Sequence, residues 1–503
     1  MGLWTLQACI AVTLITIHAV FVLLKYRRKK HSNRSLPLPP GPLKLPFIGN
    51  LLYFIGPLRH NPHRGLARLA QTYGPVVSFR PGTAQNIVLV SSSQAAREAL
   101  AANDAALTVR PVPDNARSLA HNAGSVFFLP ASDLLWKKHR ITIGARFSGR
   151  SLNVTRPMRD RNARQLTEHF RACSGHVVAV KEALMSTVLN SVSNVLFSKD
   201  VVGMHALGEA QDFKELIVKL TTEMAKPNIS DAFPFLAPLD LLGSRRSFSR
   251  SQVKLYKFLD EEFVEPRLAA GEKHDDVLDD ILSQYAKSQL TRSDITRFLA
   301  DVFISGSDTS ALTVQWAMAQ LLRHPEKMQK VRTELAANLG SKEFVEESDL
   351  VQLPYIQAVV KETLRLHPAT PLIPREVVSD NMFLGGFHIP IGTCIFINLW
   401  DIGRDPASWP QPEEFMPERF LGDRAVDYRG SDFAFKPFGA GRRVCPGLDI
   451  SARFVPHLLA SILHKIDWRL PDGMAPEDVD LSDHHRTMLD LATPLRAIPV
   501  SIV

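Results

Sequence analysis

Cysteine is scarce in this sequence, and the few cysteines lie far apart. The chain has 503 residues and four cysteines, Cys9, Cys173, Cys394 and Cys445. A disulfide framework like that of small secreted domains is excluded, because such frameworks need many closely spaced cysteines. There is also no Cys-x-x-Cys pair, so a zinc site built on such pairs is excluded. We expect most of these cysteines to be reduced thiols.

Acidic residues are absent from the first 34 residues, and this absence explains most of the net charge of +8. Six of the eight excess positive charges are found here, at Lys25, Arg27, Arg28, Lys29, Lys30 and Arg34. A nucleic-acid-binding protein would carry its basic patch on the folded body. The rest of this chain is close to neutral, so we expect no nucleic-acid partner.

Formal charge is also absent from Leu3 to Leu24, a run of 22 mostly apolar residues. As a helix this run is about 33 Å long, enough to cross the hydrocarbon core of a bilayer. The cationic cluster follows it directly, which holds the following chain in the cytosol and is the wrong order for a cleavable signal peptide. Residues 1–34 are therefore predicted to form a single-pass membrane anchor with a cationic stop; an interfacial helix is the alternative.

The rest of the chain, residues 35–503, is predicted to be one large domain, mainly α with small β-sheets, that begins with a stiff Pro-rich hinge over 36–42. Repeats and low-complexity tracts are absent. Amphipathic stretches predict helices over 92–101, 180–197, 209–226, 252–268, 293–323 and 325–339. Short β-like runs predict strands at 76–79, 86–90 and 393–398. The polar, basic segment 243–251 is predicted to be a solvated loop, and residues 366–447 to form loops and short strands.

Cys445 lies in the glycine-rich segment Phe-Gly-Ala-Gly-Arg-Arg-Val-Cys-Pro-Gly, residues 438–447. Glycines let the backbone approach the sulfur closely, and neighbouring positive charge favours the thiolate. A single thiolate of this kind could be a nucleophile, a redox sensor or a metal ligand. An axial thiolate on heme iron is a ligand set that needs only one cysteine.

The sequence at this point resembles the cytochrome P450 superfamily. The family pattern Phe-x-x-Gly-x-Arg-x-Cys-x-Gly is complete over residues 438–447. Further family motifs occur in the family order, namely the Pro-rich hinge, Trp136-x-x-x-Arg140, Ser305-Gly-Ser-Asp-Thr309, Glu362-x-x-Arg365 and Pro417-Glu-Arg-Phe420. The resemblance covers residues 36–503 and implies the cytochrome P450 fold, with heme b (iron protoporphyrin IX) as the cofactor and Cys445 as its iron ligand.

The resemblance also implies roles for other residues. Glu362, Arg365 and Arg419 are expected to form a buried network that supports the cysteine loop. Arg140, Arg375 and Arg443 are expected to bind the heme propionates, since guanidinium groups suit carboxylates. Trp136 is expected to assist them, and Phe438 to contact the cofactor as part of the cysteine motif.

The predicted helix over 293–323 contains a glycine and several hydroxyl residues in its middle, which are poor choices for a helix. The family uses this place to bind O₂ and relay protons, so Asp308 and Thr309 are expected to be the acid and the hydroxyl of that relay. Ser305 departs from the usual alanine or glycine. The expected substrate pocket is apolar and includes Phe298, Val302, Phe303, Ser305, Thr370 and Ile373; core packing is the alternative for each of them.

The motifs look most like plant A-type enzymes of the endoplasmic reticulum, in the group with geraniol hydroxylases and cereal diterpene hydroxylases. Residues 449–451, Asp-Ile-Ser, depart from that group's Pro-Leu-Ala. The resemblance implies a monooxygenase with its catalytic domain on the cytosolic side, acting on a small hydrophobic substrate with O₂. A diterpene olefin is favoured over a monoterpenol. No dinucleotide-binding Gly-x-Gly-x-x-Gly follows a strand, so electrons are expected from a separate protein. For a microsomal member, the resemblance implies that this protein is NADPH–cytochrome P450 reductase. A phenolic or flavonoid substrate, or an isomerase or dehydratase that needs no O₂, are the alternatives.

Overall fold

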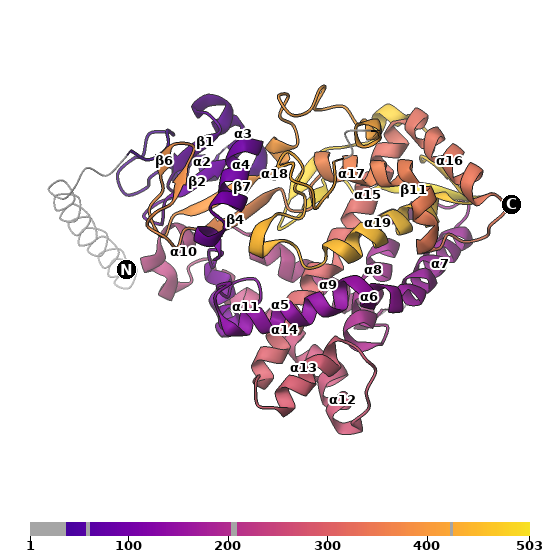
Figure 1. Ribbon diagram of the computed structural model, residues 1–503, viewed down its shortest axis with the longest axis horizontal. Helices are drawn as coiled ribbons and strands as arrows, with labels where there is room; N and C mark the ends of the chain where they lie inside the picture. Colours follow the sequence, from indigo (N-terminus) through magenta and orange to yellow (C-terminus); the bar gives the residue numbers. More distant parts are fainter. Residues whose placement is uncertain (1–36, 57–60, 203–208, 423–425, 503) are drawn as a thin grey trace, which may run out of the picture.

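The computed structural model describes residues 37–56, 61–202, 209–422 and 426–502. The predicted membrane anchor and its cationic stop lie outside these ranges. Within them, no helix combines the length and the apolar character needed to span a membrane. Figure 1 shows most strands gathered with the first helices at one end of the body, and a large helical part at the other end.

Helices dominate the described chain, as the sequence predicts. The first part contains α2 (Leu51–Ile55), α3 (Pro62–Tyr73), α4 (Ser93–Arg97), α5 (Leu134–Phe147), α6 (Gly149–Val154), α7 (Arg156–Ala172) and α8 (Val180–Phe197). The middle contains α9 (Glu209–Ala225), α10 (Ile229–Ala232), α11 (Ser244–Leu259), α12 (Glu265–Ala270), α13 (Val277–Ala286), α14 (Arg292–Ser307) and α15 (Thr309–Arg323). The last part contains α16 (Pro325–Leu339), α17 (Pro354–Leu366), α18 (Leu399–Ile402) and α19 (Leu448–Leu463).

The strands form four small sheets. The largest has the order β1-β2-β7-β4, built from β1 (Val76–Phe79), β2 (Ile87–Val90), β7 (Cys394–Asn398) and β4 (Leu372–Glu376). In it β2 and β7 run parallel, whereas β1–β2 and β4–β7 are antiparallel. The others are β3-β11-β8, β9-β10 and β5-β6, from β3 (Val178–Ala179), β11 (Arg496–Ser501), β8 (Ile466–Arg469), β9 (Asp483–His485), β10 (Leu489–Leu491), β5 (Phe383–Leu384) and β6 (Phe387–His388).

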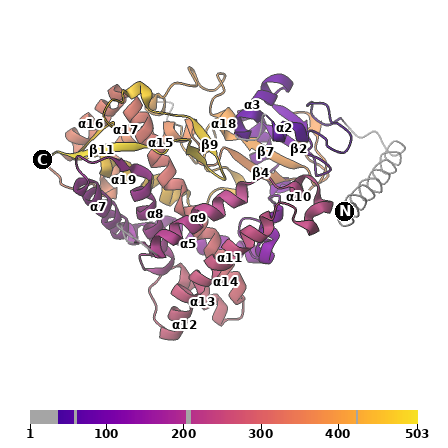
Figure 2. The same cartoon turned by 180° about the vertical axis from the view of Figure 1, so that it is seen from behind.

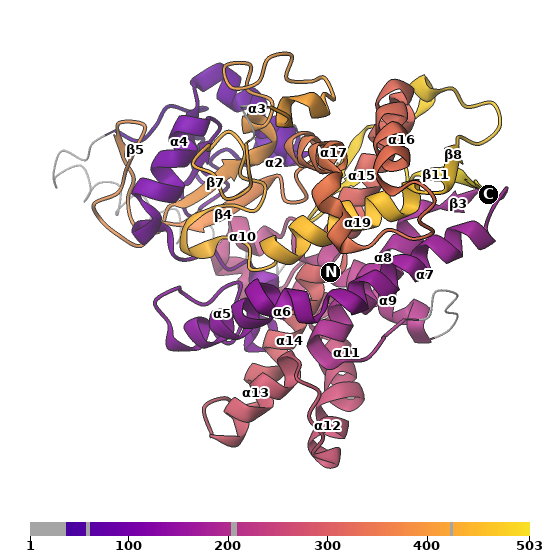
Figure 3. The same ribbon diagram turned by 45° about the vertical axis from the view of Figure 1, so that its right-hand side comes forward.

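The core of the helical part is built around α15. Every residue of α15 from Ser310 to Leu322 is buried, which is typical of a helix enclosed on all sides. It packs against α8, α17 and α19. Seen from behind, α9 and α11 lie across the middle of the body, and α11 packs against α9 and α14 (Figure 2). Figure 3 shows α12 and α13 projecting away from the body. The core therefore holds α19, which follows the cysteine loop, against the helix that contains Thr309.

Several predicted elements are confirmed, and two need correction. The helices over 180–197 and 325–339 and the strand at 76–79 have the predicted bounds. The segment 243–251 is not a loop, because α11 already begins at Ser244. The carboxylate of Asp240 accepts hydrogen bonds from the first backbone amides of this helix, and Phe248 is buried. The predicted helix over 293–323 is broken at Asp308 into α14 and α15.

Candidate active site at Cys445

The cysteine loop, residues 438–447, is fixed by tight backbone contacts. The Cys445 amide donates a hydrogen bond of 2.9 Å to the Phe438 carbonyl, which closes the loop on itself. Gly441 adopts φ 70°, and a side chain there would begin 2.9 Å from the Leu100 carbonyl and against the Asp104 carboxylate. Only glycine fits this position. The Phe438 ring packs edge-to-face on Tyr428, with 5.2 Å between ring centroids.

Burial and the neighbouring groups act in opposite directions on the Cys445 thiol. Burial raises the pKa of the Cys445 thiol above its ordinary value, whereas the Gly447 amide, Arg140 and Arg110 act in the opposite direction. The net effect favours the protonated thiol when these groups act alone. A metal cation at the sulfur would reverse the balance, because a coordinating thiol loses its proton. The residues present therefore fit the iron of the expected heme.

Four arginines lie close to the Cys445 sulfur or to each other. They are Arg110, Arg140, Arg375 and Arg443. In the described part of the chain none of the four has a carboxylate within ion-pair distance. Burial, followed by repulsion from Arg110 and Arg443, holds the pKa of Arg375 well below its ordinary value. Burial and repulsion from Arg110 and Arg140 lower that of Arg443 to about 9. Four guanidinium groups gathered in one place, two of them buried, call for an anionic partner, and the two propionates of heme would fit this need.

Arg443 is also fixed by neutral groups. Its side chain donates to the carbonyls of Thr108 and Phe127, at 2.8 and 3.0 Å. Its guanidinium lies over the Trp136 ring, 5.0 Å from the centroid, and Arg140 lies 5.7 Å from the same ring. The Trp136 indole N–H donates to the Val126 carbonyl at 3.2 Å. Trp136 therefore orders two of the four arginines by stacking, while its own donor is engaged by backbone.

Arg110 is the member of this cluster that sequence analysis missed as a cofactor residue. It lies in a Val-Arg-Pro sequence, just before η3 (Asp114–Ala123). The sequence shows only a charged residue between apolar neighbours, a pattern that a solvated arginine also has, so it did not indicate a cofactor site. Its proximity to Arg140 and Arg375 becomes visible only in the fold.

Glu362, Arg365 and Arg419 form a network of ion pairs, as predicted from their motifs. The Arg365 guanidinium donates to both carboxylate oxygens of Glu362, at 2.6 and 2.8 Å, and Arg419 donates to Oε1 at 3.2 Å. The side chains of Glu362 and Arg365 are 0% exposed. Arg365 also donates to the Pro412 carbonyl at 2.7 Å, and the Met416 amide donates to Glu362 at 2.8 Å. The network therefore joins α17 to the chain segment that contains η7 (Pro417–Phe420).

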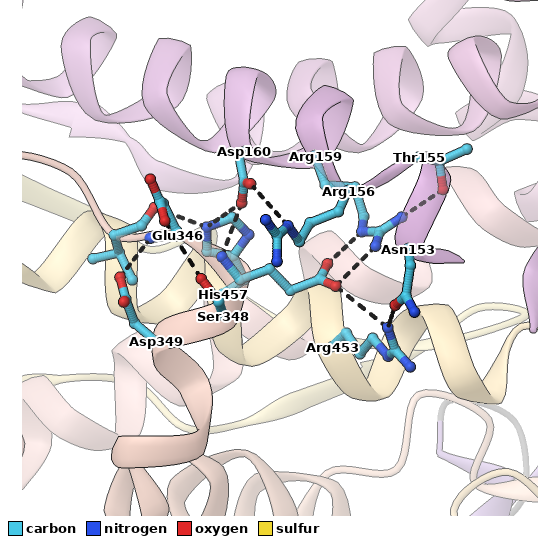
Figure 4. A network of polar contacts seen from close by, with 12 residues as sticks. Asn153, Thr155, Arg156, Arg159, Asp160, Glu346, Ser348, Asp349, Arg453 and His457 are labelled. Atoms are coloured by element: carbon cyan, nitrogen blue, oxygen red, sulfur yellow. Dashed lines mark hydrogen bonds and ion pairs between the residues drawn. The ribbon is translucent and has the colours of Figure 1, made fainter. Parts of the chain in front are cut away.

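A second network of charged residues joins α19 to α7. Figure 4 shows Arg159 and Asp160 of α7 meeting Arg453 and His457 of α19. Glu347, at the start of η6 (Glu347–Gln352), accepts from Arg159 at 2.8 Å and lies 3.6 Å from Arg453. Since α19 begins three residues after Cys445, this second network restricts movement of the segment that follows the cysteine.

The helix break at Asp308 places the predicted relay residues at a junction. The Thr309 hydroxyl donates to the Ser305 carbonyl at 3.3 Å, and the Ser305 hydroxyl donates to Val302 at 3.1 Å. Gly306 has a packing reason of its own, because a side chain there would begin 2.8 Å from Val192 of α8. The hydroxyls of this junction thus bond to helix carbonyls.

The carboxylate of Asp308 has different partners from Thr309. Its Oδ1 lies 3.3 Å from the Lys181 ammonium of α8, which also lies 2.6 Å from Asp490 of β10. Burial raises the pKa of the Asp308 carboxyl above its ordinary value, Lys181 and Arg486 lower it, and Asp490 adds to the rise. An acid with a raised pKa suits proton transfer near neutral pH. Sequence analysis missed Lys181 and Asp490, for which no local motif gives a signal.

The residues predicted for the substrate pocket divide into two groups. Phe298 and Phe303 are 0% exposed. The Phe298 ring packs on the His139 ring with 4.6 Å between the ring centroids, and the Phe303 ring packs on the Phe213 ring with 5.3 Å between them. These contacts are compatible with core packing, the alternative considered from the sequence. Ile373 of β4 lies beside Gly439 of the cysteine loop. Val302 and Ile373 are largely buried, whereas Ser305 and Thr370 are more open. All six residues stay predictions for the substrate pocket.

Comparison with known proteins identifies the family. The family model described as Cytochrome P450 matches residues 39–492. Cytochrome P450 76M5 of Oryza sativa subsp. japonica is 43% identical, and the match covers 99% of both chains. Ent-cassadiene C11-alpha-hydroxylase 1 of the same plant is 42% identical over 96% of this chain and 97% of the relative. Geraniol 8-hydroxylase of Catharanthus roseus is 39% identical over 97% and 99%. The fold, the cysteine loop and these relatives agree, and the chain belongs to the cytochrome P450 family of monooxygenases, which use heme b.

Proposed function

We propose that this protein hydroxylates a plant terpenoid, with a polycyclic diterpene olefin favoured over a monoterpenol, at the endoplasmic reticulum membrane. The observation that carries the chemistry is the position of Cys445 near four arginines, Arg375 and Arg443 among them buried, for which the described residues offer no carboxylate within ion-pair distance. The substrate class rests on the relatives, which include proteins named for hydroxylation of ent-cassadiene and of geraniol. The largely apolar side chains of Val302 and Ile373 are compatible with a hydrocarbon substrate.

In the proposed mechanism each residue of the site has a limited task. The Cys445 thiolate would hold the iron of heme b, and Arg110, Arg140, Arg375 and Arg443 would hold its propionates. Bound heme b supplies the activation of O₂ and the transfer of one oxygen atom to a C–H bond, while the second oxygen leaves as water. Thr309 offers a proton from Oγ1, and Asp308 resupplies it. The buried apolar walls keep bulk water away from these groups.

The two electrons come from NADPH through a separate reductase in this proposal. Lys137 of α5 and Arg442 of the cysteine loop are exposed, and Lys138 is half-buried. They offer positive charge to an acidic partner, NADPH–cytochrome P450 reductase. Arg443 is unsuited to such docking, because its buried guanidinium is engaged by backbone carbonyls.

The test is reconstitution of the full chain with a plant reductase in microsomes, followed by mass spectrometry of terpene olefins and alcohols. We expect an NADPH- and O₂-dependent product that is heavier than the substrate by one oxygen atom. Conversion of phenolics alone would contradict the terpenoid assignment. Turnover without reductase would contradict the monooxygenase reaction itself and favour an isomerase or dehydratase.

A further inference from the structure

Asp308 and Thr309 are neighbours in sequence but bond to different parts of the molecule. Thr309 bonds to the backbone of its own helix, whereas the Asp308 carboxylate lies at an ion pair with Lys181. Asp308 Oδ1 is buried and makes no well-directed hydrogen bond, although the ammonium is 3.3 Å away. The Asp308 carboxylate therefore lies close to the Lys181 ammonium, and its Oδ1 can still accept a hydrogen bond.

Lys181 is held more closely by Asp490 than by Asp308, at 2.6 Å against 3.3 Å. Asp490 is in turn fixed by the Gln315 amide of α15 at 3.0 Å and by the Leu491 amide at 2.9 Å. The side chains of Lys181, Asp308 and Asp490 are 17%, 13% and 14% exposed. One ammonium therefore serves two carboxylates at a place that solvent reaches.

A small chamber adjoins the same carboxylates. Its volume is about 10 Å³, the size of one water molecule, and its polar lining is made by Asp308, Asp490, Arg486, Thr221 and Thr487. Two carboxylates, a guanidinium and two hydroxyl residues offer a water enough hydrogen-bond partners. A water here can pass protons between the hairpin of β9 and β10 and the acid.

We propose that Lys181 and Asp490 are positioning residues that hold Asp308 beside this chamber and control how it takes up protons from solvent. The inference rests on the proposed function, in which Asp308 resupplies Thr309. Lys181 and Asp490 touch neither heme nor substrate, and they act through the charge and the orientation of Asp308.

The two residues have opposite effects on Asp308. Lys181 stabilises the carboxylate and lowers its pKa, whereas Asp490 repels the carboxylate and raises the pKa. Arg486, from the turn between β9 and β10, acts with Lys181, and the neutral groups Gln315 and Thr221 complete the surroundings. Removal of Lys181 must therefore move the protonation of Asp308 to higher pH, and removal of Asp490 must move it to lower pH.

The experiment compares Lys181→Met and Asp490→Asn in the holoprotein with reductase. NADPH oxidation and peroxide release are measured against pH without substrate, and product per NADPH is measured with an accepted substrate. We expect the pH midpoint of these profiles to shift by about one unit, upward for Lys181→Met and downward for Asp490→Asn. Lys181→Arg keeps the charge and should restore the wild-type profile, with Lys181→Gln replacing the methionine variant if that variant fails to fold.

A matched control uses the ion pair of Lys342 and Asp349, 2.7 Å apart and also partly exposed. Lys342→Met and Asp349→Asn make the same chemical changes away from the site and should leave the profile unmoved. A second readout is independent of turnover: unfolding of Lys181→Met, Asp308→Asn and the double variant should show non-additive midpoints. Additive midpoints, unmoved pH profiles, or shifts of both variants in one direction would overturn the proposal. If wild type oxidises NADPH but converts no terpenoid, only the substrate assignment fails.

Discussion

Two charge networks of this protein have the same kinds of residues and opposite properties. In the network of Glu362, Arg365 and Arg419, the central pair is 0% exposed and every strong donor has an acceptor. In the network of Lys181, Asp308 and Asp490, the side chains are partly exposed and one oxygen of Asp308 lacks a well-directed bond. A saturated buried network resists change, and an unsaturated one with access to solvent can exchange protons. We propose that the first network supports the cysteine side and that the second belongs to the proton relay.

The largest effect is expected when Cys445, the proposed iron ligand, is replaced. Cys445→Ser should abolish the band at about 450 nm of the reduced, CO-treated protein, because that band requires thiolate-bound heme iron. Cys173→Ser and Cys394→Ser should keep it, since neither residue is in the cysteine loop. Persistence of the band in Cys445→Ser would show that another residue is the ligand.

Removal of one charge from the saturated network should cost stability. Glu362→Gln leaves two buried guanidinium groups without their carboxylate, and we expect the free energy of unfolding to fall by about 3–5 kcal/mol. The control is Glu261→Gln, which breaks an exposed i,i+4 pair with Lys257 and should change it by less than about 0.5 kcal/mol. Urea unfolding of the holoprotein measures both, and equal effects would remove the structural role of the Glu362 network.

Much of the fold follows from local patterns, and much of the site does not. The amphipathic repeats of α8 and α16 are complete within their own segments, so their bounds could be predicted. The start of α11 could not, because its basic residues are neutralised by Asp114 and Asp240, outside the helix. Asp308 sits in a motif and was predicted as a relay residue. Its partners Lys181 and Asp490 come from distant segments.

The same reason explains the arginine cluster. Arg140, Arg375 and Arg443 belong to motifs that resemble those of the family, so their roles could be proposed from the sequence. Arg110 has the same surroundings in the fold but no such motif. Phe298 and Phe303 illustrate the reverse problem, because an apolar residue near a site can face either the pocket or the core, and sequence does not separate the two.

Low pH should weaken the packing of α5 on α14, which depends on a neutral, buried His139. His139 of α5 packs on Phe298 of α14, and burial lowers the pKa of His139 to about 4. The unfolded chain takes up this proton near pH 6.5, so the stabilisation is complete above pH 6.5 and is lost as the pH falls towards 4. The loss should reach about 3 kcal/mol. His139→Phe should flatten this part of the curve of unfolding free energy against pH; an unchanged slope would assign the acid sensitivity to other groups.

The smallest effect concerns membrane orientation. With the domain in the cytosol, the Asn-x-Thr sequence at Asn153, which is exposed, should carry no glycan. Asn228 is a poor reporter, because its buried amide donates to Asp114 and Asn115. Mass analysis after endoglycosidase treatment of microsomal protein provides the test, with an added exposed sequence in a lumenal fusion as positive control. A glycan on Asn153 would reverse the proposed orientation.

The most direct test of the whole account is the ratio of product formed to NADPH consumed, for wild type and Thr309→Ala with an accepted terpene. Thr309 does not bind the iron, so the variant should keep the band at about 450 nm and continue to consume NADPH. Without the hydroxyl that delivers protons, we expect a lower ratio and more peroxide. An unchanged ratio would remove Thr309 from the mechanism, and product formed without reductase would contradict the monooxygenase reaction.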